Sequence, residues 1–405
     1  MNKMKLAIIR EGKVPPDKRV PLTPKQCVEV LETFNNVEIL VQTSHVRAFP
    51  DQAYADLGLT VVEDISDCDI MIGVKEVNEE DLIPNKKYLF FSHTYKEQPY
   101  NRHLLQAILD RNIQLIDYEV LTNKAGNRII GFGRYAGIVG CYNGFLAFGK
   151  KHGLYNLKPA NLCEDRLELE QELKKIVLPA STKIVATGFG RVGNGAREIL
   201  SSIGLKEVFP EAFLNESFDE PVFTHLQVND YFAKADGSDF DKYVFFESGE
   251  GHVSTFPRYM DVANMYIACH YWDASSPFIF TREDLKGENM NISVVSDISC
   301  DIDGPVASTV RPSTIADPLY GYDSATETEV DFMAKGAIVV QAVDNLPCEL
   351  PKDASEDFGN ELIKGVFPSL FGEDTDGIIE RASETSLQGE LMPDYVYLKD
   401  YLARK

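Results

Sequence analysis

The sequence predicts an α/β protein made of two doubly wound domains with a cleft between them, the first domain being discontinuous. Over the first 120 residues, short β-branched and aromatic runs alternate with helical stretches, which is typical of βαβ units and a parallel sheet. A second alternating block begins near Lys183. A chain of 405 residues also exceeds the usual size of one core, so two domains are expected.

The first block is expected to contain strands at residues 5–10, 37–41, 70–75, 88–93 and 114–119 and helices at 24–33 and 98–110. Thr23 and Pro24 mark the start of the first helix, because threonine caps a helix and proline fits its first turn. The second block has expected strands at 183–187, 265–271 and 292–297. The glycine-punctuated, apolar residues 136–152 are expected to form a helix that joins the two blocks.

A last helix is predicted from residue 351 to about residue 370. Its start is marked by Asp353 and Glu356, which stand at capping-box spacing. This helix would return the chain to the first domain. We therefore expect a first domain of residues 1–135 plus 325–405, wrapped around a second domain of residues 136–324.

Composition restricts the class of partner. Hydrophobic residues make up 44% of the chain, and the formal net charge is -23, which disfavours binding to nucleic acid or to an anionic membrane. No apolar run approaches the roughly 20 residues that cross a bilayer, and the start of the chain is too weakly apolar for a signal peptide. A cytoplasmic location is expected. The seven cysteines are scattered without CxxC spacing, so we expect reduced thiols and no metal site.

A glycine fingerprint stands at the start of the second block. The strand at 183–187 leads directly into Gly188-x-Gly190-x-x-Gly193 and then into a helix. Gly188 would allow the tight turn, Gly190 would let the backbone approach a diphosphate, and Gly193 would let the helix pack closely. The amides at the helix start, around Arg191 and Val192, would hold the phosphates. The pattern predicts a Rossmann-like dinucleotide site, although a tight turn without a ligand would give the same spacing.

Further residues of this cofactor site are expected at strand ends. Glu211 lies at a suitable distance to hold the ribose hydroxyls and would favour NADH, but Pro210 interrupts the strand before it, so NADH and NADPH both stay open. Tyr271, Asp297 and Asp301 follow the strands at 265–271 and 292–297 and are assigned to the same site. The segment 297–304 lacks the closing glutamate of a calcium loop.

Titratable side chains close three strands of the first block. Lys75 and Glu76 follow the third strand, His93 follows the fourth, and Glu119 follows the fifth. Ligands of open α/β sheets lie outside the carboxyl ends of the strands, so these groups are expected to share one site. A lysine with a lowered pKa can deprotonate an amine, a histidine can serve a carbonyl, and the carboxylates can tune both. Surface charges and one structural histidine would show the same spacing.

Basic residues gather in the same part of the sequence. Arg19, Lys96, Arg128 and Arg134 are expected to bind substrate, because guanidinium groups grip carboxylates in bidentate fashion. Each of them taken alone is equally compatible with a solvated surface charge.

The motifs around these residues resemble a known family. Gly73-Val-Lys75-Glu76, Phe90-Phe-Ser-His93-Thr-Tyr-Lys96, Leu115-Ile-Asp-Tyr-Glu119 and Phe132-Gly-Arg-Tyr-Ala-Gly137 resemble the alanine dehydrogenase and transhydrogenase N-terminal superfamily. Within it the chain is most similar to lysine-forming saccharopine dehydrogenases and to the lysine-ketoglutarate reductase domain of aminoadipic semialdehyde synthases. The likeness continues through Tyr271-Trp272, 296–301, 314–318 and 344–347.

The resemblance implies a reaction and a role for each residue. Lysine and 2-oxoglutarate would condense through a carbinolamine to an imine, which hydride from NADPH or NADH reduces to saccharopine, or the reverse. The resemblance makes Lys75 the base for the amine and His93 the acid–base group at the carbonyl carbon. By the same match, Glu76 and Glu119 tune the pair, and Arg19, Lys96 and Arg128 bind substrate carboxylates. Arg134 departs from the family, where the position is usually aromatic or an amide.

Two other functions stay open from the sequence. One is a related amino-acid dehydrogenase, alanine dehydrogenase-like or opine-type, whose substrate would need fewer cationic partners than the three carboxylates of saccharopine. The other is a nucleotide-binding regulator without catalysis. The expected partners are amino-acid and oxo-acid substrates, and the expected state is a monomer or a small homo-oligomer.

Overall fold

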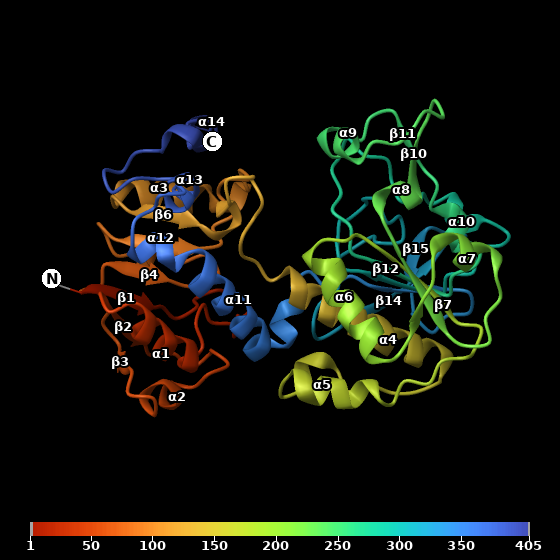
Figure 1. Cartoon of the computed structure of the whole chain (residues 1–405), viewed down its shortest axis with the longest axis horizontal. Helices are drawn as coiled ribbons and strands as arrows, with labels where there is room; N and C mark the ends of the chain where they lie inside the picture. The colour runs from red at the N-terminus through yellow and green to blue at the C-terminus, as the bar shows by residue number, and fades with distance from the viewer. Residues whose placement is uncertain (1–2, 404–405) are drawn as a thin grey trace. The chain divides into compact units, whose positions relative to one another are not determined.

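The computed structural model describes residues 3–403, which form two compact units. Unit 1 comprises residues 3–132 and 351–403, and unit 2 comprises residues 133–350 (Figure 1). The predicted α/β class is confirmed, because each unit is built on a largely parallel sheet. The boundary expected at residue 325 is wrong. Residues 325–350 contain two strands, β15 (Thr328–Val330) and β16 (Ile338–Gln341), that pair within the sheet of unit 2.

The sheet of unit 1 has the strand order β3-β2-β1-β4-β5-β6, with all pairs parallel. Its strands are β1 (Met4–Ile8), β2 (Val37–Gln42), β3 (Thr60–Val62), β4 (Ile70–Ile72), β5 (Lys87–Phe90) and β6 (Gln114–Asp117). The chain builds outward from β1 to β3 and then resumes at β4 on the other side of β1. The carboxyl ends of β1 and β4 therefore lie at a topological switch point, the place where such sheets bind ligands.

Helices cover both faces of this sheet. They are α1 (Pro24–Thr33), α2 (Asp51–Ala55), α3 (Arg102–Asp110), α11 (Pro351–Gly365), α12 (Phe367–Phe371), α13 (Ile378–Ala382) and α14 (Leu398–Ala403). Alternate residues of β1 point to opposite faces of the sheet. Leu6 packs in one hydrophobic core with Phe358 of α11, whereas Ala7 packs in a second core with Ile108 of α3. Helix α1 has the predicted bounds, and Thr23 forms a capping box with Gln26.

The C-terminal segment of unit 1 lies against the outer strand β6. Ser383 forms an antiparallel bridge with Ile116, and the amide of Glu384 donates to the carbonyl of Leu115 at 2.8 Å. Beyond it, Leu398 and Tyr401 of α14 pack on Leu105 of α3. Residues more than 250 positions apart in the sequence are thereby joined beside the end of β6.

The sheet of unit 2 has the order β15-β14-β16-β13-β12-β7-β9-β8. Its other strands are β7 (Lys183–Thr187), β8 (Lys206–Glu207), β9 (Val222–Leu226), β12 (Met265–Ala268), β13 (Val294–Asp297) and β14 (Leu319–Asp323). Strand β14 pairs antiparallel with both β15 and β16, and the remaining pairs are parallel. A separate antiparallel pair is formed by β10 (Phe232–Lys234) and β11 (His252–Ser254).

The longest helix of unit 2 is α4 (Gly133–His152), which packs closely against α6 (Arg191–Ser202). A Cβ atom on Gly137 would lie 1.9 Å from the carbonyl oxygen of Val192, so glycine is required for this approach. The shorter helices are α5 (Arg166–Leu173), α7 (Pro210–Asn215), α8 (Val228–Tyr231), α9 (Lys242–Glu247) and α10 (Pro257–Met260). All seven cysteines are free thiols. Within residues 3–403, no helix has the length and apolar character that crossing a membrane requires.

Candidate active site

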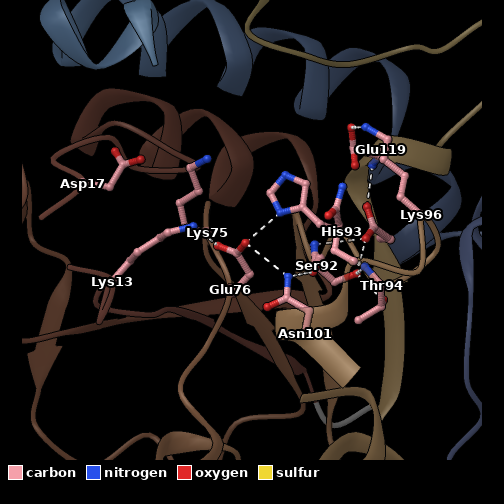
Figure 2. A network of polar contacts seen from close by, with 12 residues as sticks. Lys13, Asp17, Lys75, Glu76, Ser92, His93, Thr94, Lys96, Asn101 and Glu119 are labelled. Carbon is pink, nitrogen blue, oxygen red and sulfur yellow. Dashed lines mark hydrogen bonds and ion pairs between the residues drawn. The ribbon is translucent and has the colours of Figure 1, made fainter. Parts of the chain in front are cut away.

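The carboxyl ends of β4 and β5 bring Lys75, Glu76 and His93 together, as the strand-end pattern predicted (Figure 2). Oε1 of Glu76 accepts a hydrogen bond from Nδ1 of His93 at 2.7 Å, and Oε2 accepts one from Nζ of Lys13 at 2.8 Å. Burial by itself would raise the pKa of Glu76, but the hydrogen bonds from His93 and Lys13 lower it below its usual range. Glu76 is therefore an ionised carboxylate that orients His93.

The imidazole of His93 is held through one nitrogen only. Nδ1 carries the proton that faces Glu76, and Nε2 has no hydrogen-bond partner among the described residues. The side chain is 23% exposed, so a small molecule can reach Nε2. Asn101 completes the surroundings, since its Nδ2 donates to Oε1 of Glu76 at 3.4 Å and to the carbonyl of Ser92 at 2.7 Å. This is the arrangement of an oriented acid–base histidine.

Lys75 is the cation of this site without an ion-pair partner. Within residues 3–403 no carboxylate lies within ion-pair distance of its Nζ. Burial lowers the pKa of Lys75, and the nearby positive charges of Arg19 and Lys13 lower it further. An amine in such surroundings loses its proton more easily than a solvated lysine and can act as a base.

A buried carboxyl group holds the backbone that carries Lys75. The amides of Val74 and Lys75 donate to the two carboxylate oxygens of Glu11, at 2.6 Å and 2.9 Å. Burial raises the pKa of Glu11 to about 8, and the neighbouring Asp17 contributes to the rise. Glu11 was missed by the sequence analysis, although it follows β1, the strand beside β4, in the same way that Lys75 follows β4.

Arg19 is buried and already engaged. Its guanidinium forms a bidentate pair with Asp17, at 3.0 Å from Nε to Oδ1 and 2.6 Å from Nη2 to Oδ2, and lies 4.2 Å from the ring centre of Phe132. Burial would raise the pKa of Asp17, but Arg19 lowers it to about 2. The charge of Arg19 is thus balanced inside the protein, and a substrate carboxylate would have to share it with Asp17.

Lys96 and Arg128 both form ion pairs with the carboxylate of Glu119. Oε1 of Glu119 lies 2.7 Å from Nζ of Lys96 and 3.6 Å from Nη1 of Arg128, whereas Oε2 is buried with no hydrogen-bond partner among the described residues. Burial would lower the pKa of Lys96, but its hydrogen bond to Glu119 raises it above the ordinary value, so this lysine stays charged. The side chains of Lys96 and Arg128 are 44% and 41% exposed, which leaves both cations accessible to an anion.

Arg134 forms an ion pair of its own. It belongs to unit 2, on α4, where its Nε and Nη2 form a bidentate pair with Glu198 of α6 at 2.6 Å and 2.9 Å. The sequence analysis grouped Arg134 with the basic residues of the first block, but α4 of unit 2 already begins at Gly133. The guanidinium fork joins two helices instead.

The glycine fingerprint of unit 2 fits a dinucleotide. Gly188 has φ of +89°, and a Cβ on Gly193 would lie 1.8 Å from the carbonyl oxygen of Gly188, so both positions exclude larger residues. A Cβ on Gly190 would meet no atom within 4 Å, which leaves the open space that an approaching diphosphate requires. His225 of β9, missed by the sequence analysis, lies 2.6 Å from the Gly188 carbonyl through Nε2 and fixes the loop.

The helix that follows the loop also fits. Helix α6 begins at Arg191 and Val192, and no side chain caps its N-terminus. The first amides of a helix carry partial positive charge and bind phosphate. Together with Gly190, they form the part of unit 2 that can hold a diphosphate.

The prediction for Glu211 is wrong. The strand next to β7 is β9, which ends at Leu226 and is followed by Gln227, whereas Glu211 lies on α7 after the outermost strand β8. The position that usually holds the ribose hydroxyls therefore carries no carboxylate. The first acid after β9 is Asp230, and its Oδ2 accepts the amide of Gln227 at 2.7 Å.

The remaining cofactor residues differ in accessibility. Tyr271 follows β12 and is 90% exposed. Asp297 is buried, and its carboxylate accepts hydrogen bonds from Ser299, Cys300 and Thr309, so it shapes its own loop. Burial, together with the charge of Asp297, raises the pKa of Asp301 to about 6. Of the two aspartates, Asp301 is the one available to a ligand.

Comparison with known proteins finds a family match and several similar proteins. Residues 7–139 match the family described as alanine dehydrogenase/PNT, N-terminal domain. An L-alanine dehydrogenase structure superposes with a TM-score of 0.64 at 16% identity, covering 99% of this chain and 100% of that one. This likeness confirms the fold.

The curated relatives carry more specific names. An alpha-aminoadipic semialdehyde synthase of Arabidopsis thaliana is 28% identical over 94% of this chain and 40% of its own length, and one of Bos taurus is 28% identical over 98% and 48%. The chain thus spans less than half of these relatives. A saccharopine dehydrogenase [NAD(+), L-lysine-forming] of Yarrowia lipolytica is 28% identical over 91% of both chains.

The buried carboxyl of Glu11 gives a prediction for stability. Its pKa is about 8 in the folded chain and near the ordinary 4.5 when unfolded, so its stabilising effect is complete below about pH 4.5 and is lost as the pH rises to about 8. Between pH 5 and 8 the free energy of unfolding of the native chain should therefore fall relative to Glu11→Gln. We expect this fall in the free energy of unfolding to be about 1–3 kcal/mol, which is less than the full pKa shift implies because Glu11 is partly exposed.

The measurement is urea unfolding of both proteins at pH 5, 6.5 and 8. Glu80→Gln, an exposed change nearby, is the matched control and should follow the native protein. Parallel pH profiles for the native chain and Glu11→Gln would contradict the assignment.

Proposed function

We propose that the chain catalyses the NAD(P)H-dependent condensation of lysine with 2-oxoglutarate to saccharopine, or the reverse reaction. The observation that carries the proposal is an unpaired, part-buried Lys75 beside a His93–Glu76 pair at the switch point of unit 1. The names of the curated relatives support the substrate pair.

In this reaction the chain's own residues move the protons. The neutral amine of Lys75 takes a proton from the ammonium group of the substrate, which frees the nitrogen to attack the carbonyl carbon. Nε2 of His93 gives a proton to the carbonyl oxygen as the carbinolamine forms, takes a proton back from the carbinolamine nitrogen, and gives it to the hydroxyl group as water leaves and the imine forms. Glu76 stabilises the protonated imidazole between these transfers. A nicotinamide, when bound, supplies the hydride that reduces the imine.

The cations of unit 1 suit a substrate with several carboxylates. Lys96 and Arg128 are exposed and charged, and Arg19 is a third cation whose charge is shared with Asp17. A two-carboxylate oxo acid can use both exposed groups, whereas alanine or pyruvate has only one carboxylate to offer. This count favours the proposed substrates over an alanine dehydrogenase-like or opine-type reaction, which remains the second candidate.

The function can be tested by following the absorbance of the reduced cofactor. Lysine, ornithine, alanine and glutamate are each combined with 2-oxoglutarate or pyruvate, and with NADH or NADPH. We expect lysine with 2-oxoglutarate to give the highest kcat/KM. A higher value for alanine or for pyruvate would overturn the substrate assignment, and cofactor binding without turnover of any pair would overturn the enzymatic one.

Substitution of the two proton-transfer residues gives a second prediction. Lys75→Met and His93→Gln should each lower kcat by about 10²- to 10⁴-fold, because each removes a group that moves a proton in the reaction. Cofactor affinity, measured by fluorescence titration, should stay within about twofold. Lys124→Met and His103→Gln, both exposed in unit 1, are the matched controls. Near-native turnover of either active-site variant would remove that residue from the mechanism.

The end of β9 gives a prediction for cofactor choice. Since Gln227 stands where a carboxylate would hold the ribose hydroxyls of NADH, we expect NADPH to be accepted. Gln227→Asp should raise the ratio of kcat/KM for NADH to that for NADPH about tenfold, because a carboxylate repels the 2′-phosphate. Asn229→Asp adds the same charge two residues further on and should leave the ratio unchanged. An equal change of this ratio in Gln227→Asp and Asn229→Asp would contradict the assignment of Gln227, because the added negative charge alone would then explain the change.

A further inference from the structure

The backbone of His93 has an unusual conformation. Its φ is 56°, in the left-handed region that non-glycine residues seldom occupy because the conformation is strained. Such a conformation persists only where the surroundings impose it. Ser92 and Thr94, the residues on either side of His93, are both fully buried. The contacts of their hydroxyl groups therefore show which side chains hold the backbone in this conformation.

Two buried carboxyl groups hold these flanking residues. The hydroxyl of Ser92 contacts Oδ2 of Asp117 at the end of β6, and the Ser92 amide donates to the same atom at 3.0 Å. Oγ1 of Thr94 lies 2.6 Å from Oε2 of Glu384, a residue of the C-terminal segment. The two hydroxyl oxygens lie 2.5 Å apart. Asp117, Ser92, Thr94 and Glu384 thus form one continuous chain of contacts.

Counting hydrogens in this chain shows that one carboxyl group is protonated. Three short contacts link the four side chains in series, namely Asp117 to Ser92, Ser92 to Thr94, and Thr94 to Glu384. A fourth contact, from Oγ of Ser92 to Oε1 of Glu384, is longer at 3.4 Å. Each of the three short contacts needs one hydrogen, and the two hydroxyl groups provide only two. The third hydrogen must belong to a carboxyl group.

The hydrogen belongs on Glu384. Asp117 accepts two backbone amides, from Ser92 and from Glu119 at 2.6 Å, and these bonds favour its ionised form. The carboxyl group of Glu384 contacts the hydroxyl groups of Ser92 and Thr94 and interacts with Asp117, and among the described residues no backbone amide donates to it. Burial raises the pKa of both carboxyl groups, and that of Glu384 rises well above its ordinary value. The other ionisable groups that interact with this pair are Tyr118 and Glu119 at the end of β6 and Tyr395, Tyr397 and Tyr401 of the C-terminal segment.

We propose that Glu384, in its neutral form, is a positioning residue that holds the Ser92–Thr94 turn so that His93 faces Glu76 and the substrate. The C-terminal segment thereby completes the active site. Its place is fixed by the backbone, since Thr385 Oγ1 accepts the amide of Leu115 at 2.9 Å and the amide of Glu384 donates to the Leu115 carbonyl. The expected effect of Glu384 on kcat rests on the proposed function, whereas its expected effect on the position of His93 does not.

The test compares Glu384→Ala with Glu384→Gln. An amide reproduces the neutral carboxyl, because its NH₂ group donates and its oxygen accepts. Glu384→Ala should lower kcat about 10- to 100-fold with KM for the reduced cofactor within about twofold, as expected for a misplaced acid–base group. Glu384→Gln should keep kcat within about threefold. Glu390→Gln, an exposed change in the same segment, is the control.

A second readout does not depend on turnover. In ¹H–¹⁵N spectra of the imidazole groups, with His93 assigned through His93→Gln, Glu384→Ala should shift the His93 resonances, whereas Glu384→Gln should match the native protein. If Glu384→Ala does not fold, Thr94→Val removes the middle hydroxyl and should have the same effect. Unchanged His93 resonances in these variants, or equal loss in Glu384→Gln and Glu384→Ala, would overturn the proposal. A native protein without turnover would overturn the proposed function alone.

Discussion

The parallel register of four strands in unit 1 determines where most of the polar side chains of the candidate site stand. Ile8 of β1, Ile72 of β4, Leu89 of β5 and Ile116 of β6 are aligned across the sheet. Three residues beyond these partners the chain carries Glu11, Lys75, Ser92 and Glu119, all at one edge. A shift of one residue in any pair would send that strand's side chains to the opposite faces, so the site depends on the register before it depends on any side chain.

His93 is the exception to this alignment, because it stands one residue further along its strand than Lys75 does. Its left-handed backbone turns the chain at this point, and the imidazole reaches Glu76 from there. The sheet alone does not impose such a turn. Contacts from outside β5 must do so, and they are supplied by Asp117 and by the C-terminal segment.

The distribution of charge supports the proposed role of Lys75 as a base. Each other cation near it has a carboxylate within ion-pair distance: Arg19 has Asp17, Lys13 has Glu76, and Lys96 has Glu119. These pairs remain charged and fixed. Burial, with the positive charges of Arg19 and Lys13 nearby, lowers the pKa of Lys75. The strongly acidic composition of the chain thus does not prevent a basic group from losing its proton locally.

Features with a local cause could be predicted from the sequence. Helix α1 has its own capping residues, the glycine fingerprint has its own steric requirements, and Lys75, Glu76, His93 and Glu119 follow apolar strands. Features that depend on distant pairing could not. Glu211 was misplaced because β9, not β8, lies beside β7, and residues 325–350 were misassigned because β15 and β16 pair with β14 of unit 2. Arg134 was grouped with its sequence neighbours, although Glu198 on another helix determines its place.

Glu11 and Glu384 show one physical solution applied to both proton-transfer residues. Each is a carboxyl group from a distant segment, with a pKa raised by burial, that holds the backbone around Lys75 or His93 rather than the reacting side chain itself. Burying a carboxyl group costs free energy unless its hydrogen bonds are satisfied. An apolar residue at either position would avoid that cost, but the amide of Lys75 or the hydroxyl of Thr94 would lose its partner. In the proposed mechanism, both carboxyl groups therefore exchange stability for the orientation of Lys75 and His93.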